Sequence, residues 1–395
     1  PVVLDVGAGV QIAPKSYTYE VKWRLFRVGI QLVSWLDQFR RLILPPEFLL
    51  WEISSAYMKS QAVATAARLN IANYLIESTK DGKWQKTPRS AQELAVLCHV
   101  TNFDFFQRLL DFLESLSIVE QYKGAYQLTR IGELLWDEHP KSSRAMLVTQ
   151  NTDHFLSASE LYNSMVSEEN RSPFQLYYEG YEQVWDFYRD NPSSSYWFNR
   201  YMTSINSQVI DSVIETYHAP DVHAYQSIVD IGGGQGMLLK QIIDQHMARS
   251  SSDNAETKKY AIFDLPSVIA QDHVQQYWQN NKQEFESKFP SFNYDENIQL
   301  IPGSFFEQVP NNYELYLMKF ILHDWSDEEC ISILSNIRSA MLSSQLTQTP
   351  RLLIIENVIH SNDPMDIIRT SQTTIDMIMV TMTNGRERTV GEYER

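Results

Sequence analysis

Cysteine is scarce in this sequence, since Cys98 and Cys330 are the only two among 395 residues. Their positions match neither a disulfide framework nor the paired spacing of a zinc site, which favours two buried thiols in a reducing compartment. Long hydrophobic runs are also absent: no stretch of about 18 apolar residues occurs, and the first residues lack a compact apolar signal region. We therefore expect neither a membrane span nor secretion, and we expect a cytoplasmic location.

An excess of positive charge is absent as well. The chain has 33 Lys and Arg residues against 49 Asp and Glu residues, which gives a net charge of −16. Binding to nucleic acid requires clustered cationic charge, so a general nucleic-acid-binding protein is not expected. Hydrophobic residues make up 43% of the chain, which is enough to bury a large core. A chain of this length and composition is expected to form two domains.

Glycine, with only 14 residues, is concentrated at one point of the C-terminal half. The run Ser227–Ile231 suits a strand that is buried on both faces, and Gly232, Gly234 and Gly236 follow it. Apolar residues at helical spacing come next, so the glycines precede a helix N-terminus with free N–H groups. The spacing differs from the dinucleotide fingerprint G-x-G-x-x-G, and no Walker lysine follows. The loop therefore predicts a close approach of a ligand to the backbone, without identifying the ligand.

Strand-like and helix-like segments alternate through the C-terminal part of the chain. Asp264 ends the second expected strand, and Leu265 and Pro266 then stop it. An acid at this point holds ribose hydroxyls in doubly wound folds. The alternation predicts an α/β fold with a parallel sheet and with ligands at the carboxyl ends of its strands. The expected strands cover residues 226–231, 260–264, 298–301, 314–322 and 351–359.

We interpret residues 1–45 as a helical N-terminal extension. Val3–Gly9 imitates a glycine loop, but too little strand precedes it, so we expect no ligand there. Residues 17–44 have a helical pattern in which aromatic and apolar side chains alternate with basic ones. Such a helix can lie on an anionic membrane, although packing on its own protein or on a dimer partner is the favoured interpretation.

Residues 46–220 are expected to form a mainly helical domain that begins at a pair of prolines. A long helical stretch is expected over 48–77. Residues 88–130 have the pattern of helix, turn, helix and hairpin, which is a winged-helix arrangement and by itself would suggest DNA binding. The second of these helices is acidic, with Arg108 as its only clear cation, which argues against that function. The remaining residues, 221–395, are expected to form the ligand-binding domain.

Five motifs of the C-terminal part resemble the signature set of the S-adenosylmethionine-dependent O-methyltransferases. The branch is that of the plant caffeic acid and flavonoid enzymes, hydroxyindole O-methyltransferase and bacterial polyketide-tailoring enzymes. The resemblance implies a Rossmann-like methyltransferase domain, with a doubly wound, mostly parallel sheet, preceded by a winged-helix-like dimerisation domain. It also implies a homodimer and a small-molecule hydroxyl acceptor. The motifs are Asp230–Gly236, Asp264–Pro266, Gly303–Phe306, Lys319–Ser326 and Asn384–Thr389.

Three residues carry the predicted chemistry. His323 follows an apolar strand and precedes a helix start, which places it at the carboxyl edge of the sheet, although a lone histidine there is more often structural. Glu356 lies in an apolar strand, where an acid needs a partner, and Glu387 by itself would be taken for a solvated surface acid. The resemblance implies that His323 is the general base that removes the acceptor's hydroxyl proton, and that the two glutamates flank and orient its imidazole. Neighbouring carboxylates would stabilise the imidazolium.

The resemblance also implies which residues bind S-adenosylmethionine, which would leave as S-adenosylhomocysteine, and it implies no metal. Relatives have an aspartate that contacts adenine where this chain has Ser304, so one charged acceptor is lost. We expect cofactor binding to be retained but weaker. The cofactor-binding residues are expected to be Asp230, Gly232, Gly234, Gly236, Asp264, Leu265, Ser304, Phe305 and Lys319. The acceptor-binding residues are expected to be Phe198, Met202, Asp324, Trp325, Ile378 and Met379.

Relatives continue beyond the motif that ends at Thr389 with a helix and two strands that complete the sheet. We therefore expect either an open sheet edge or strands that are supplied in another way. The main prediction is an O-methyltransferase that methylates a hydroxyl of a small aromatic, enolic or polyketide-type substrate, free or tethered to a carrier protein, by in-line transfer. The alternatives are a catalytically silent cofactor-binding or winged-helix regulatory protein, and an N-methyltransferase of the same family.

Overall fold

The computed structural model describes residues 2–6, 10–12, 17–78, 83–216, 222–249, 258–288, 292–359 and 366–395. The chain forms two compact units, each with hydrophobic cores of its own. Among the described helices, none is both long and apolar enough to cross a bilayer. The first unit consists of residues 1–35, 161–189 and 206–395, and the second of residues 36–160 and 190–205.

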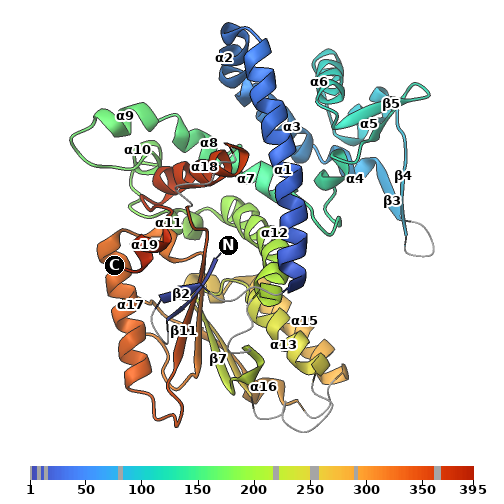
Figure 1. The fold of residues 1–395 in the computed structure, drawn as a ribbon. Coiled ribbons are helices and arrows are strands. Elements are labelled where there is room, and N and C mark those ends of the chain that lie inside the picture. Colours follow the sequence, from blue (N-terminus) through green and yellow to red (C-terminus); the bar gives the residue numbers. More distant parts are fainter. Residues whose placement is uncertain are drawn as a thin grey trace. The chain divides into compact units, whose positions relative to one another are not determined.

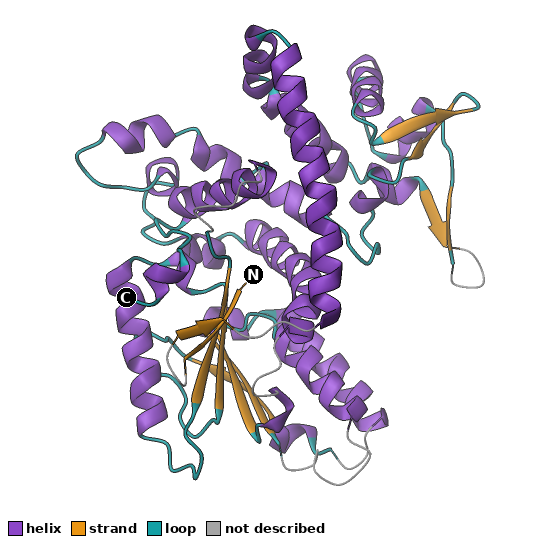
Figure 2. Cartoon of the chain, in the orientation of Figure 1, coloured by secondary structure: helices purple, strands orange, loops and turns teal. Residues whose placement is uncertain are grey.

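A seven-stranded sheet forms the centre of the first unit (Figures 1 and 2). Five of its strands are parallel, and β7 lies in the middle of these five. Every residue of β7 is buried, as expected for a β-branched strand that is covered on both faces. The sheet order is β2-β1-β11-β10-β7-β8-β9, with β1 (Val2–Val6), β2 (Val10–Ile12), β7 (Ser227–Ile231), β8 (Lys259–Asp264), β9 (Ile298–Pro302), β10 (Leu315–Lys319) and β11 (Arg351–Glu356).

Helices cover both faces of this sheet (Figure 1). On one face, Ile228 packs in a core with residues of α13 (Met237–Arg249) and α15 (Asp272–Lys288). On the other face, Val229 packs in a core with residues of α17 (Asp327–Leu342). The layers leave the carboxyl ends of the strands to the connecting loops, and the doubly wound α/β fold that the sequence predicts is confirmed.

At the sheet edge beyond β11, two N-terminal strands extend the sheet, which is the second of the two expected alternatives, strands that are supplied in another way. Strand β1 pairs antiparallel with β11, with Val2 opposite Glu356 and Asp5 opposite Leu353, and β2 then pairs with β1. The expectation that too little strand precedes the first glycines was therefore wrong for residues 2–6, while Gly7 and Gly9 lie outside the described residues. The physical reason is that a short β-branched segment becomes a strand once a long-range edge satisfies its backbone groups.

The remaining helices of the first unit are mostly short. Helix α18 packs against α10. Two longer helices, α1 (Tyr17–Ile43) and α12 (Pro192–Thr216), include residues of both units. The helices are α9 (Leu161–Val166), α10 (Pro173–Tyr177), α11 (Val184–Asp190), α14 (Pro266–Ile269), α16 (Tyr294–Asn297), α18 (Asp366–Met382) and α19 (Val390–Tyr393).

The second unit contains the expected helix, turn, helix and hairpin. Ser90 forms a complete capping box with Glu93 at the start of the first of these helices, as its spacing predicts. The segment expected to be helical over 48–77 is mostly helical, with breaks at Ser55 and at Asn70, which adopts a left-handed conformation (φ 62°), but its last two residues, 76 and 77, belong to a strand. The elements are α2 (Pro46–Ser54), α3 (Ala56–Arg68), α4 (Ile71–Tyr74), α5 (Ala91–Leu97), α6 (Phe103–Ser115), α7 (Arg144–Gln150), α8 (Asp153–Ala158), β3 (Ile76–Ser78), β4 (Trp84–Lys86), β5 (Val119–Tyr122) and β6 (Ala125–Leu128).

Candidate active site

His323 lies in a tight turn at the carboxyl end of β10. The strand expected to reach residue 322 ends at Lys319, because Phe320 takes a left-handed conformation (φ 56°). The N–H of Phe320 still donates to the carbonyl of Ile355 at 3.0 Å, which keeps the turn attached to β11. A single 3-10 turn, Leu322–Asp324, then buries the imidazole of His323, so that the residue is 9% exposed.

Glu356 ends β11 beside this turn and is completely buried. Its Oε1 accepts hydrogen bonds from the backbone N–H groups of Ile321, at 3.0 Å, and Leu322, at 2.8 Å. Its Oε2 lies 3.7 Å from Nδ1 of His323. A buried acid in an apolar strand needs partners, and Glu356 has them in the turn that carries His323.

Glu387 approaches the imidazole from the C-terminal loop. Its Oε1 lies 3.0 Å from Nδ1 of His323, and the residue is only 3% exposed. The interpretation of Glu387 from the residues alone, as a solvated surface acid, was therefore wrong. The reason is a close passage of two backbones: a Cβ on Gly385 would lie 2.1 Å from the carbonyl oxygen of His323, so only glycine fits there. The next residue, Arg386, donates its N–H to that same carbonyl at 2.8 Å.

The three acids surrounding His323 decide its protonation. Burial lowers the pKa of this imidazole, but the negative charges of Glu356, Asp324 and Glu387 outweigh burial and raise it to about 10. Asp324 lies on the other side of the ring, 3.8 Å from Nε2, and burial raises the pKa of its carboxyl to about 7 against the opposing effect of His323. Burial likewise raises the pKa of Glu356. The group formed by His323, Glu356 and Glu387, called the base side below, thus stabilises a proton on the imidazole.

The glycine loop after β7 forms the second part of the arrangement. Gly232, Gly234 and Gly236 all have positive φ, at 67°, 58° and 80°, which other residues adopt only under strain. A Cβ on Gly236 would lie 2.7 Å from the ring of Trp278, whereas a Cβ on Gly234 would meet nothing within 4 Å. The loop is therefore packed tightly at its end and open at its middle glycine, where a ligand can approach the backbone.

Asp264 ties this loop to the end of β8. Its carboxylate accepts from the N–H of Gly234 and from the N–H of Leu265, both at 2.7 Å. Burial raises the pKa of Asp264 to about 6, and these two N–H groups oppose the rise. The three glycines and Asp264, called the cofactor side below, present a carboxylate beside open backbone. This donor and acceptor set fits the hydroxyls of a ribose at a strand end.

The cofactor side and the base side contact each other. A Cβ on Gly232 would lie 2.4 Å from Cδ1 of Ile321, which immediately precedes the histidine turn. Asp230 and Lys319 are charge-coupled on adjacent strands: burial raises the pKa of Asp230 to about 7, and Lys319 opposes the rise. Burial lowers the pKa of Lys319 to about 8, against the acids Asp230 and Glu356. Lys319 therefore interacts electrostatically with Asp230, which precedes the glycine loop, and with Glu356 of the base side.

The other predicted binding residues fall into two groups. In the first unit, Ser304 accepts a hydrogen bond from the N–H of Phe306 at 3.3 Å, and the ring of Phe305 packs edge-on against Trp325 at 5.8 Å. Ile378 and Met379 are half-buried on α18. Phe198 and Met202 lie half-buried on α12 in the second unit, so they are not among the residues that the first unit brings together.

Three residues that position the base side were not predicted as site residues. Asp376 of α18 accepts the backbone N–H of Glu387 at 2.9 Å, and nothing in the local sequence indicates this contact. Gly385 lies within the motif Asn384–Thr389 but was not singled out. Arg388 donates to the carbonyls of Leu322 and Trp325 on either side of the histidine turn. In the sequence Arg388 stands between Glu387 and Thr389, and nothing in this local pattern indicates that its side chain binds two backbone carbonyls.

Comparisons with known proteins identify the family and the fold. Residues 159–395 match an O-methyltransferase domain, and residues 51–138 match an O-methyltransferase dimerisation domain. Tabersonine 16-O-methyltransferase of Catharanthus roseus is 26% identical over 87% of this chain and 88% of its own length. The structure of human N-acetylserotonin methyltransferase aligns with a TM-score of 0.68 at 20% identity, over 89% of this chain and 90% of that one.

A second solved structure supports the same fold. The structure of mitomycin 7-O-methyltransferase aligns with a TM-score of 0.70 at 22% identity, over 88% of this chain and 89% of that one. At such identities the structural likeness supports the fold, while the domain match covers more than half of the chain and defines the family. The chain therefore belongs to the O-methyltransferase family, and the family and fold class expected from its sequence are confirmed.

Proposed function

We propose that this chain transfers the methyl group of S-adenosylmethionine to a hydroxyl of a small aromatic, enolic or polyketide-type molecule. The observation that supports it most is the arrangement of His323 with Glu387 at 3.0 Å and Glu356 at 3.7 Å, directly beside a glycine loop with open backbone. The curated relatives are named for methylation of oxygen atoms on small molecules, which favours oxygen over nitrogen as the acceptor.

The residues present fit the proposed cofactor. Asp264 would accept from its ribose hydroxyls, the backbone at Gly234 would pass along its methionyl part, and Lys319 with Asp230 would border it. When bound, S-adenosylmethionine supplies a methyl group on a positively charged sulfur, which is already an activated electrophile. The protein's contribution is then to align the acceptor oxygen and to remove its proton.

The base side suits the removal of that proton. A phenol has an ordinary pKa of about 10, and the acids surrounding His323 raise the pKa of its imidazole to about 10. Proton transfer between two groups of similar pKa is nearly free of thermodynamic cost, and the carboxylates of Glu356 and Glu387 then stabilise the imidazolium. The free imidazole is the active form, so we expect the rate to rise with pH until His323 has lost its proton.

His323→Gln tests this function. The amide keeps a polar group of similar size and cannot accept the proton, so we expect kcat to fall by about 10²-fold or more, while calorimetry gives an unchanged affinity for S-adenosylhomocysteine. The assay follows transfer of a labelled methyl group to a panel of phenols and polyketide-type enols. A wild-type chain that binds the cofactor but methylates no member of the panel would instead support the silent cofactor-binding alternative.

We also propose a homodimer. The dimerisation-domain match is supported by apolar side chains of α2 and α3 that are exposed in the single chain: Phe48, Leu50, Trp51, Ile53 and Tyr57. Residues 46–220 would form the dimer contacts and, through Phe198 and Met202, part of the acceptor site. Residues 221–395 would bind the cofactor and provide the base, and residues 1–45 would form an extension. Tethering of the acceptor to a carrier protein stays a proposal, as does a cytoplasmic location, which two free buried thiols support.

A further inference from the structure

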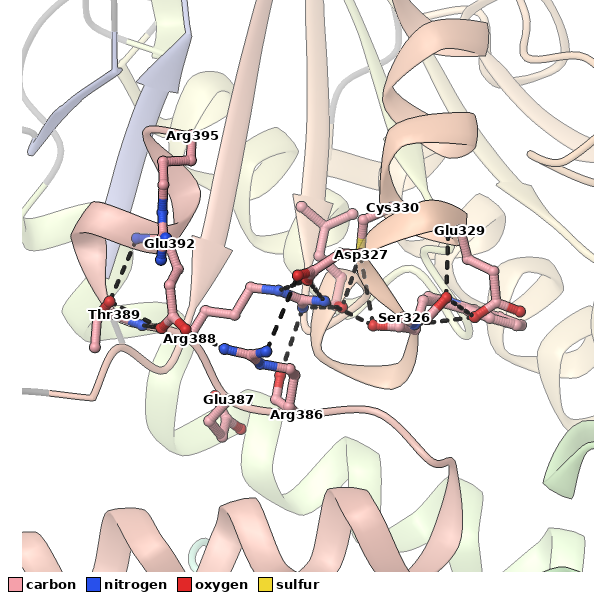
Figure 3. Close-up of polar contacts among 12 residues, drawn as sticks. Ser326, Asp327, Glu329, Cys330, Arg386, Glu387, Arg388, Thr389, Glu392 and Arg395 are labelled. Atoms are coloured by element: carbon pink, nitrogen blue, oxygen red, sulfur yellow. Dashed lines mark hydrogen bonds and ion pairs between the residues drawn. The ribbon is translucent and has the colours of Figure 1, made fainter. Parts of the chain in front are cut away.

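The side chain of Arg388 contacts the segment around the histidine turn, which lies more than 60 residues earlier in the sequence (Figure 3). Its Nη1 donates to the carbonyl of Leu322 at 2.7 Å, and its Nη2 donates to the carbonyl of Trp325 at 2.8 Å. These two carbonyls flank His323 and Asp324 in the chain. Arg388 is only 4% exposed, so its guanidinium is part of the interior.

A carboxylate completes the surroundings of this guanidinium. Oδ1 of Asp327, the first residue of α17, accepts from Nε at 2.9 Å and from Nη2 at 2.7 Å. Figure 3 shows Arg388 and Asp327 meeting beside the start of this helix. One planar group therefore contacts both ends of the histidine turn and the helix that follows it. Lysine cannot reproduce these contacts, because its ammonium is a single point of charge.

The backbone on both sides of Glu387 is fixed in the same region. The carbonyl of Arg388 accepts from the N–H of Ile359 at 3.0 Å, and the N–H of Arg386 donates to the carbonyl of His323 at 2.8 Å. Glu387 therefore sits between one residue that binds the histidine turn through its backbone and another that binds it through its side chain. A shift of either anchor moves the carboxylate of Glu387 relative to the imidazole.

We propose that Arg388 is a positioning residue for methyl transfer, which acts by holding the loop of Glu387 against the turn of His323. The proposal rests on the proposed function, because it concerns the base of that reaction. The guanidinium of Arg388 binds the carbonyls of Leu322 and Trp325 rather than the imidazole of His323, and this role requires no contact with the substrate. It sets the separation of 3.0 Å between Oε1 of Glu387 and Nδ1 of His323, and through it the proton affinity of the imidazole.

Arg388→Lys is the first test, because it keeps the charge and removes the two-ended contact. We expect kcat to fall by no more than the roughly 10-fold loss expected for Glu387→Gln, with KM and the affinity for S-adenosylhomocysteine unchanged. The rise of kcat/KM with pH should shift to lower pH, because a displaced Glu387 raises the pKa of His323 less. Arg338→Lys, an exposed arginine on α17, is the matched control and should leave all four quantities unchanged.

A double-mutant cycle separates positioning from simple stabilisation. If Arg388 acts through Glu387, the double variant of Arg388→Lys and Glu387→Gln should be about as slow as Glu387→Gln alone. Multiplicative losses, or a lower melting temperature with an unchanged pH profile, would overturn the proposal. Asp327→Asn, which weakens one contact of Arg388 at a half-exposed site, gives the same test with a smaller effect if Arg388→Lys does not fold.

Failure of the proposed function can be distinguished from failure of the role proposed for Arg388. If the wild-type chain transfers no methyl group, that function is wrong, and an NMR titration of the His323 imidazole still tests Arg388. A titration midpoint that moves downward in Arg388→Lys and stays in place in Arg338→Lys would support the positioning role. An unchanged midpoint in both variants would contradict it.

Discussion

The cofactor side and the base side meet at Gly232 and Ile321, yet they are held by different physics. The cofactor side depends on backbone conformation, since its glycines take positive φ and Asp264 is bound by backbone N–H groups. The base side depends on buried charge, since three acids surround one imidazole. The difference predicts separable failures: changes to the glycines should reduce cofactor affinity, and changes to the acids should reduce turnover and alter its pH dependence.

Among substitutions that leave His323 in place, the largest effect should come from the cofactor side. Gly236→Ala adds a side-chain carbon at φ 80°, 2.7 Å from the Trp278 ring, and we expect S-adenosylhomocysteine to bind roughly 10- to 100-fold more weakly in calorimetry. Gly124→Ala is the control, because this hairpin glycine also has φ 80° and nothing lies within 4 Å of its added carbon. Equal cofactor affinity in Gly236→Ala and wild type would show that the loop's conformation does not determine binding.

A smaller effect should come from the base side. Glu387→Gln removes one of the charges that raise the pKa of His323, so that pKa should fall by about one unit or more. The base must be unprotonated, so the rise of kcat/KM with pH should move to lower pH by the same amount. We expect kcat to decrease about 10-fold, because a weaker base also loses its orienting partner.

Glu394→Gln, at an exposed position near the same end of the chain, should change neither quantity. A shift to higher pH in Glu387→Gln would contradict the electrostatic account of the base side, because removal of a negative charge cannot favour the imidazolium.

The smallest effect concerns Ser304. Ser304→Asp restores a charged acceptor at the position where related enzymes have aspartate, and a charge-assisted hydrogen bond exceeds a neutral one by about 1 kcal/mol. We therefore expect about 5-fold tighter binding of S-adenosylhomocysteine with unchanged kcat. Ser304→Asn adds the same shape without charge and should give less than half of this gain. Tighter cofactor binding in Ser304→Asn but not in Ser304→Asp would mean that the shape of the side chain, rather than its charge, limits affinity.

The central fold could be predicted from local sequence because its signals are local. The strand around Val229 is a β-branched run that ends in glycines, and its observed bounds, Ser227–Ile231, differ from the expected ones by one residue. Strand β1 carries a similar apolar run, but its partner is the distant strand β11, and no local pattern announces such a pairing. Asn70 shows a second limit of local patterns, because this left-handed residue interrupts a segment whose sequence pattern is helical throughout.

The same distinction applies to the site. The positions of His323 at a strand end and of Glu356 within an apolar strand follow from hydrophobic patterning, whereas their roles came from the family resemblance. The burial of Glu387 depends on Gly385, Asp376 and Arg388, which meet the histidine turn or the glutamate across long separations in the sequence. Contacts of this kind are set by tertiary packing and leave no periodic trace.

The pairing of β1 with β11 also has a consequence for biosynthesis. Val2 lies opposite Glu356, so more than 340 residues must be synthesised between the first strand and its partner. At ribosomal rates of about 5 to 20 residues per second, this delay lasts roughly 20 to 70 seconds. Throughout that interval the emerging hairpin has no neighbour and offers open strand edges to chaperones or to other nascent chains. The margin of the sheet next to Glu356 therefore closes only after β11 itself has been synthesised.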